Sequence, residues 1–131
     1  MDAARVTLQF DPNYVGTMTS PTGTVLLGDQ PNGVQPYHLL FGALASCFYA
    51  TFLGVANKKR LTFERVELTI DGHKRDEVPP TLDYVKITFV IHQPSNEEQL
   101  RKSAELGAKY CSIHETISKV AKIDLDVQFV G

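Results

Sequence analysis

The sequence has little net charge and few cysteines. Its 131 residues carry a formal net charge of −2, and two of them are cysteines. Without an excess of basic residues, the composition gives no support for nucleic-acid binding. The chain does not open with a charged segment, an apolar run and a small-residue cleavage site, so we expect no export and a cytoplasmic location. Because cytosolic thiols are mostly kept reduced, we expect Cys47 and Cys111 to be either buried free thiols or a redox-active pair, not a structural disulfide.

Several common site motifs are absent as well. The sequence has no glycine-rich phosphate loop, no serine nucleophile elbow and no motif of paired carboxylates. Histidines and cysteines do not cluster at short spacing, so no metal site is predicted. No linker, internal repeat or low-complexity segment interrupts the chain. We therefore predict a single domain over residues 1–131.

One long stretch, residues 37–56, contains no charged residue. Pro36 suits the first position of a helix, and the cations at 58–60 suit its end. The stretch predicts a helix of about five turns, with apolar side chains on every side. We expect this helix to be buried all round, and a domain this small needs a partner subunit to cover it. A membrane span is the alternative, although small and polar residues such as Gly42 and Ser46 dilute its hydrophobicity.

Alternating polar and apolar residues predict strands on both sides of this helix. The predicted strands are residues 5–10, 14–19, 24–27, 63–71, 82–92 and 123–129. The two long strands that follow the helix are expected to pair as an antiparallel ribbon. Strands that are grouped apart from helices favour an α+β fold with antiparallel sheet.

A second helix is predicted before the last strand, from Ser95 as N-cap to about Tyr110, with Glu98 completing a capping box. Its apolar face contains Ala and Gly, so it can lie close to another element. We expect it to pack on the small residues around Ala43, Ser46 and Cys47. That packing would bring Cys111 towards Cys47. A short helical piece, residues 112–119, follows.

Two cysteine segments resemble those of the OsmC/Ohr family. Residues 36–48 join a Pro, an apolar run of small residues and Cys47 deep in a helix, like the first cysteine motif of that family. Residues 111–118 resemble the second motif, in which a Cys opens a short segment before the final strand. The order of elements and residues 26–29 fit too, so the resemblance covers nearly the whole chain. It implies an OsmC-like α+β fold with antiparallel sheets around two central helices, in an intertwined homodimer.

The resemblance also implies a function, the thiol-dependent reduction of organic hydroperoxides by a peroxiredoxin-like redox protein. Cys47 would be the peroxidatic cysteine and Cys111 the resolving one. In this chemistry a thiolate attacks the peroxide, becomes a sulfenic acid and condenses with a second thiol to a disulfide. A dithiol reductant such as a lipoylated protein would recycle the pair. No metal, organic cofactor, nucleic acid or membrane is expected.

Further residues are candidates for contact with the substrate or the thiols: Tyr37, Phe41, Phe48 and His114. The aromatic rings offer an apolar wall for alkyl peroxides, although aromatics at helical spacing are also typical of a core. His114 follows Cys111 by one helical turn. It is either a base for the resolving step or an ordinary surface histidine.

The chain departs from the family at the residues that activate the thiol. Active Ohr-type members carry an Arg in the loop after the first strand and a Glu directly after the Pro of the first motif. Here the loop 11–16 has no Arg, and Tyr37 stands in the Glu position. The sequence does not place any other cation at Cys47; those considered are Arg5, Arg65, Arg75 and Arg101. The alternative is therefore an OsmC-like protein without peroxidase activity that binds a small apolar ligand in the dimer cleft.

Overall fold

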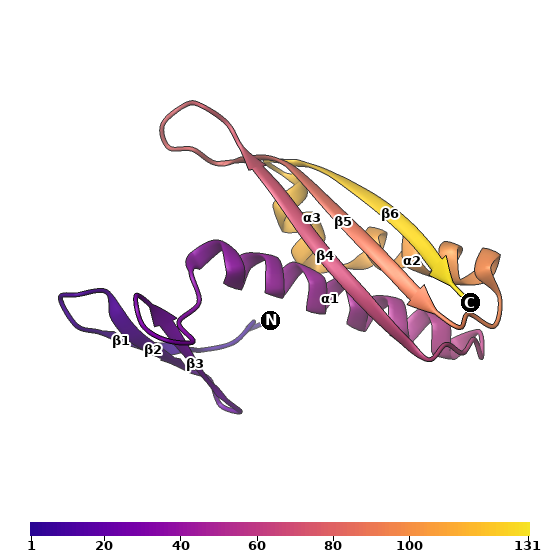
Figure 1. The fold of residues 1–131 in the computed structure, drawn as a ribbon, viewed down its shortest axis with the longest axis horizontal. Helices are drawn as coiled ribbons and strands as arrows, with labels where there is room; N and C mark the ends of the chain where they lie inside the picture. The colour runs from indigo at the N-terminus through magenta and orange to yellow at the C-terminus, as the bar shows by residue number, and fades with distance from the viewer. The chain divides into compact units, whose positions relative to one another are not determined.

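The structure, a computed structural model, describes residues 1–131 and confirms an α+β fold. The elements are β1 (Thr7–Phe10), β2 (Val15–Thr19), β3 (Thr24–Gly28), α1 (Pro36–Lys58), β4 (Arg65–Lys74), β5 (Leu82–His92), α2 (Glu97–Tyr110), α3 (Ser112–Ser118) and β6 (Lys122–Val130) (Figure 1). The chain divides into two compact units, residues 1–40 and residues 41–131.

The first unit is built on an antiparallel sheet with strand order β1-β2-β3. The Ser20 hydroxyl holds the turn between β2 and β3 by accepting the N–H of Gly23 at 3.0 Å. Before β2, the carboxylate of Asp11 accepts the N–H groups of Asn13 and Val15. Tyr14 has a φ of 61°, outside the range of a β-strand, so the strand begins one residue later than predicted.

The sheet of the second unit has strand order β4-β5-β6 and differs from the predicted antiparallel sheet in one pairing. β4 and β5 form the expected antiparallel ribbon. β6 pairs parallel to β5, because the crossover through α2 and α3 returns the chain to the end of the sheet where β5 began. The crossover helices and the C-terminal part of α1 lie behind this sheet in the view of Figure 1.

An aromatic cluster forms the centre of the second unit. Phe89 of β5 makes edge-to-face contacts with Phe48 and Phe52 of α1, with ring centroids 5.1 and 4.8 Å apart. All three side chains are fully buried. Together with Leu44 and Ala56, the two α1 aromatics form a stripe with a spacing of four residues, which is how a helix presents one face to a sheet.

The opposite side of α1 is open. Gly42, Ser46, Ala50 and Gly54 repeat at the same spacing and are exposed, and an added Cβ at either glycine would meet nothing within 4 Å. The single chain therefore does not bury this helix all round, since one sheet covers only one stripe, and its burial by a partner subunit stays a prediction. By length and composition alone, α1 is also apolar enough to cross a membrane.

Helix α2 begins at a different cap and packs at a different place than predicted. Its N-cap is Asn96, whose side chain accepts the N–H of Gln99 at 3.0 Å. The Ser95 hydroxyl instead accepts the N–H of Thr62 at 2.9 Å. A Cβ added to Gly107 of α2 would lie 3.1 Å from the backbone of Phe52, so the close approach falls there. The open stripe of α1 receives no part of α2.

Candidate functional site

Cys47 lies in the middle of α1, one residue before the fully buried Phe48 and one residue after the exposed Ser46. Its side chain is half-buried as a result, at the border between the core and the open stripe. The uncharged sequence around it extends the helix without interruption on both sides. The helix therefore holds this thiol in a fixed position while leaving part of it accessible.

Cys111 lies at the break between α2 and α3, where the backbone is extended (φ −73°, ψ 120°). Its side chain is 1% exposed. The sulfur acts as the N-cap of α3 by accepting the N–H of His114 at 3.4 Å. The same break leaves the N–H groups of the first α3 residues without a partner inside the helix.

The break at Cys111 and the middle of α1 meet, so the two thiols are neighbours. The Cys111 thiol lies near enough to the Cys47 sulfur to lower the pKa of Cys47 by hydrogen bonding. The Ser112 hydroxyl oxygen lies 4.0 Å from the same sulfur. The backbone N–H groups of Ser112 and Ile113 also point to it. Both cysteines are free thiols. The expected approach of Cys111 to Cys47 is therefore present, although α2 does not pack on the small residues of α1.

The surroundings of the two sulfurs shift their pKa values in opposite directions. Burial by itself raises the pKa of Cys47, but the hydrogen bonds from Cys111, Ile113 and Ser112 outweigh burial and hold this pKa below the ordinary value of a thiol. Burial raises the pKa of Cys111, and its hydrogen bond to Cys47 raises it further. Cys47 is therefore the sulfur that ionises first, and it is also the more accessible of the two.

Of the other candidate residues, His114 lies beside Cys111. Burial lowers the pKa of its imidazole, while the charge of Glu115 acts in the opposite direction. The ring is therefore neutral at neutral pH. The contact with Cys111 is made by the backbone N–H of His114.

The three aromatic candidates have different surroundings. Phe48 is fully buried against Phe89 and belongs to the core, so it lines no open surface of this chain. The Phe41 ring lies over Gly72 of β4, where an added Cβ would come within 2.5 Å of its Cζ. Tyr37 is half-buried in the first turn of α1, in the unit of residues 1–40.

Three of the cations considered for Cys47 are engaged with other groups. Arg65 forms a 2.8 Å ion pair with Glu67. Arg101 donates to the carbonyl of Val127 at 3.2 Å and lies over the ring of Phe129. Arg75 donates to the carbonyl of Pro79 in the β4–β5 loop. The groups that most strongly lower the pKa of Cys47 are neutral N–H, O–H and S–H groups.

Ser112 was not among the residues selected from the sequence. The signal was its position directly after Cys111, at the start of the predicted helical piece, where side-chain and backbone donors are both free to point outwards. A serine beside a cysteine is too common a pair to be noticed without the geometry.

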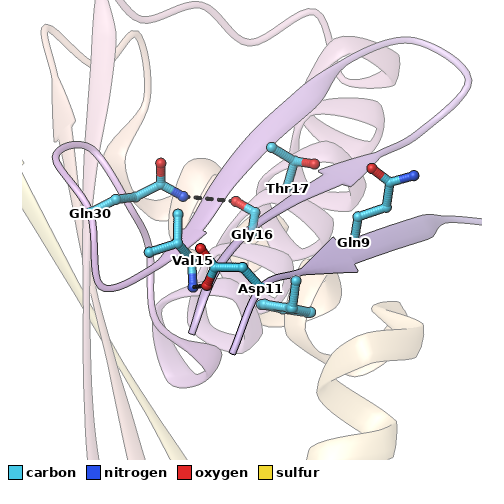
Figure 2. A pocket seen from close by; sticks show the side chains of 7 residues that line it. Gln9, Asp11, Val15, Gly16, Thr17 and Gln30 are labelled. Atoms are coloured by element: carbon cyan, nitrogen blue, oxygen red, sulfur yellow. Dashed lines mark hydrogen bonds between the residues drawn. The ribbon is translucent and has the colours of Figure 1, made fainter. Parts of the chain in front are cut away.

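The first unit contains a pocket of about 330 Å³ beside the loop that has no Arg (Figure 2). Its lining residues are Gln9, Phe10, Asp11, Val15, Gly16, Thr17 and Gln30. The Gln30 amide donates to the carbonyls of Gly16 and Leu27, both at 2.8 Å. The Gln30 amide thus binds the backbone of β2 and β3, and no cation is among the lining residues.

The chain is similar to proteins of a known family. Residues 28–126 match the family model described as OsmC-like protein. A hydroperoxide reductase of Mycoplasma genitalium is 26% identical over 109 residues, which cover 78% of this chain and 76% of the relative.

Solved structures show the same fold. A crystal structure of an OsmC-like protein from Mycoplasma pneumoniae superposes with a TM-score of 0.86 at 22% identity, covering 99% of each chain. The organic hydroperoxide resistance protein OhrB of Bacillus subtilis superposes with a TM-score of 0.65 at 15% identity, covering 95% of this chain and 98% of that one. With most of its length matched by the family model and its fold shared from end to end, the chain belongs to the OsmC-like protein family.

Proposed function

We propose that the protein reduces organic hydroperoxides through the Cys47/Cys111 pair. The observation that carries the proposal is that the break at Cys111 meets the middle of α1, where the Ser112 hydroxyl lies 4.0 Å from the Cys47 sulfur. In this site the pKa of Cys47 is lowered and that of Cys111 is raised. The names of the curated relatives from two Mycoplasma species, both hydroperoxide reductases, support the same reaction class.

The accessibility of the two thiols supports the proposed roles. Cys47 is half-buried and Cys111 is 1% exposed, so a peroxide reaches Cys47 first. The Cys47 thiolate attacks one peroxide oxygen, the O–O bond breaks, the alcohol leaves with a proton, and Cys47 becomes a sulfenic acid. The deprotonated sulfur of Cys111 then attacks the Cys47 sulfur, the S–O bond breaks, and water leaves as the disulfide forms.

A dithiol reductant must return the disulfide to two thiols, and a lipoylated protein is a reductant of this class. A thiolate of the reductant attacks one sulfur of the disulfide and forms a mixed disulfide. The second thiol of the reductant then attacks this mixed disulfide, which releases the reduced protein and leaves the reductant as a disulfide. Because Cys111 is buried, the sulfur that the reductant can reach is that of Cys47, and Cys111 is the leaving thiolate. The reaction uses no metal or organic cofactor.

A second copy of the chain is the proposed partner at the open stripe of α1. Small residues at every fourth position let another helix approach closely, and their exposure leaves room for it. In the first unit, Leu8 and Phe10 are likewise exposed, at 44% and 50%. A homodimer would cover these apolar surfaces. The apolar helix α1 would then be shielded from water, as a cytoplasmic protein requires.

The alternative function is the binding of a small apolar ligand without turnover. The observation that favours it is the absence of an Arg from the loop 11–16. Under this alternative the cysteines line the ligand site and do not react with peroxide.

Free-thiol titration and intact mass, measured after one equivalent of tert-butyl hydroperoxide or of hydrogen peroxide, separate the two functions. The proposed reaction removes both thiols with the loss of two hydrogens in mass, and proceeds faster with the alkyl peroxide. Cys111→Ser is the matched variant, which should gain one oxygen on Cys47 and form no intramolecular disulfide. Both thiols remaining intact over hours, or full turnover by Cys47→Ser, would show that the proposed reaction is wrong.

A further inference from the structure

Ser112 provides a side-chain hydroxyl beside the Cys47 sulfur. It is the first residue of α3, and its hydroxyl oxygen lies 4.0 Å from the Cys47 sulfur, a distance at which either atom can act as donor. Its own backbone N–H also acts on this sulfur and lowers the pKa of Cys47. One residue therefore presents two donors to the thiol from outside α1.

The position of Ser112 is fixed by its neighbours. Cys111 before it is held as the N-cap of α3 by the 3.4 Å hydrogen bond from His114. After it, the Ser112 carbonyl accepts the Thr116 hydroxyl at 3.0 Å. The backbone on both sides of the hydroxyl is thus anchored, and the hydroxyl hydrogen can still rotate. It can accept from the thiol and donate to the thiolate without any movement of the chain.

We propose that Ser112 activates Cys47, by donating hydrogen bonds from its hydroxyl and its backbone N–H to the Cys47 thiolate. The role of Ser112 in peroxide reduction rests on the proposed function, since Ser112 would prepare the attacking sulfur. The geometric content of the inference stands without that function.

The chemistry of such a site differs from that of a site with a cation. Hydrogen bonds to the charged form of an acid lower its pKa without adding a charge, and here they act against the burial of Cys47. A thiolate attacks best when its pKa lies close to the ambient pH, because nucleophilicity falls as the pKa falls. Neutral donors therefore raise the thiolate fraction of Cys47 without adding a cation to the site. Of the groups that act on Cys47, only Cys111 itself titrates, and its pKa is raised.

The test is the rate of Cys47 alkylation by iodoacetamide between pH 5 and 10, followed by peptide mass on the fully reduced protein. Ser112→Ala should move the profile to higher pH and slow alkylation near neutrality by about three- to tenfold, since one pKa unit is a tenfold change in thiolate. Ser112→Thr keeps the hydroxyl and should stay within about twofold of the parent. Ser118→Ala is the matched control, because its hydroxyl lies at the other end of α3 and donates to Glu115.

Two results would overturn the inference: a Ser112→Ala profile that coincides with that of the parent, or a Ser112→Thr profile displaced as far as that of Ser112→Ala. Far-UV circular dichroism and the urea midpoint establish that each variant is folded, so that a displaced profile reports on the thiol. The alkylation arm contains no peroxide. If tert-butyl hydroperoxide leaves the parent unoxidised while the Ser112→Ala profile is still displaced, the proposed function fails and the assignment of Ser112 stands.

Discussion

Larger side chains in the open stripe of α1 should stabilise an isolated chain and destabilise a dimer whose second copy covers the stripe. The perturbation is the double variant Gly42→Leu/Gly54→Leu. In an isolated chain both positions face open space, with nothing within 4 Å of an added Cβ. Leucine is a better helix former than glycine by roughly 0.8 kcal/mol per residue, so the isolated chain would gain roughly 1.5 kcal/mol.

A covered stripe reverses this sign. Excess side-chain volume in a packed contact costs about 1–3 kcal/mol at each site, and twofold symmetry places every substitution in the interface twice. The four leucines of a dimer would then cost about 4–12 kcal/mol, against a helix gain of about 3 kcal/mol for both chains. We expect the variant to dissociate, or to assemble only at much higher concentration than the parent.

Sedimentation velocity over a range of protein concentrations measures the assembly, and thermal unfolding at the same concentrations measures the stability. The parent should sediment as a dimer and the variant as a monomer with a lower, concentration-dependent midpoint. Lys102→Leu places the same side chain on an exposed part of α2 and should leave the assembly unchanged. A variant with the parent's sedimentation coefficient and a midpoint raised by roughly 5–7 °C would refute the reasoning, because it would show α1 gaining helix propensity in open solvent.

Other predictions follow from single contacts. Phe89→Ala removes the ring at the centre of the aromatic cluster and should cost about 3–5 kcal/mol in urea unfolding, whereas Val78→Ala, on a side chain that is 92% exposed, should change stability by less than about 0.5 kcal/mol. The hydrogen bond from His73 to Asp83, and the charge of that carboxylate, raise the pKa of His73, so the pair contributes to stability below the unfolded pKa of His73 and loses its contribution as pH rises through the folded pKa. Asp83→Asn should therefore flatten the pH dependence of the unfolding midpoint in that window, and an unchanged slope would contradict the pairing.

Periodicity was sufficient to predict most strands and helices, because these are local properties. The bounds of β5 are those that were predicted, since its apolar and polar residues alternate along its length. Local pattern fails where two options lie one residue apart, as for Ser95 and Asn96, both of which are good N-caps. The long-range contact decides: the Ser95 hydroxyl is taken by Thr62, which leaves the cap to Asn96.

Sheet pairing and burial depend on what lies outside the local window. The alternation in residues 123–129 predicts a strand but carries no information on whether it runs parallel to β5, which the crossover determines. Similarly, the composition of α1 indicates apolar surroundings on all sides, and only the structure shows that one chain provides them for a single stripe.

The two cysteines of the site were found by resemblance, and their neighbours mostly were not. Phe48 was selected for its aromatic ring, but the same ring is what the core requires next to Phe89. Ser112 was overlooked because its contribution comes from direction as well as residue type: the end of α2 turns the start of α3 towards Cys47. The orientation of the start of α3 towards Cys47 is a property of the tertiary fold and cannot be read from the spacing of residues in the sequence.

The parallel pairing of β6 also bears on the order in which the chain acquires its structure. The β4–β5 ribbon closes through a short loop, whereas β6 can join β5 only after the whole intervening crossover has been placed. Cys111 and Ser112 belong to that crossover. The thiol pair should therefore assemble in a late folding step. An incompletely folded chain then presents Cys47 without its hydrogen-bond donors, and the lowered pKa of Cys47 marks the chains that have finished folding.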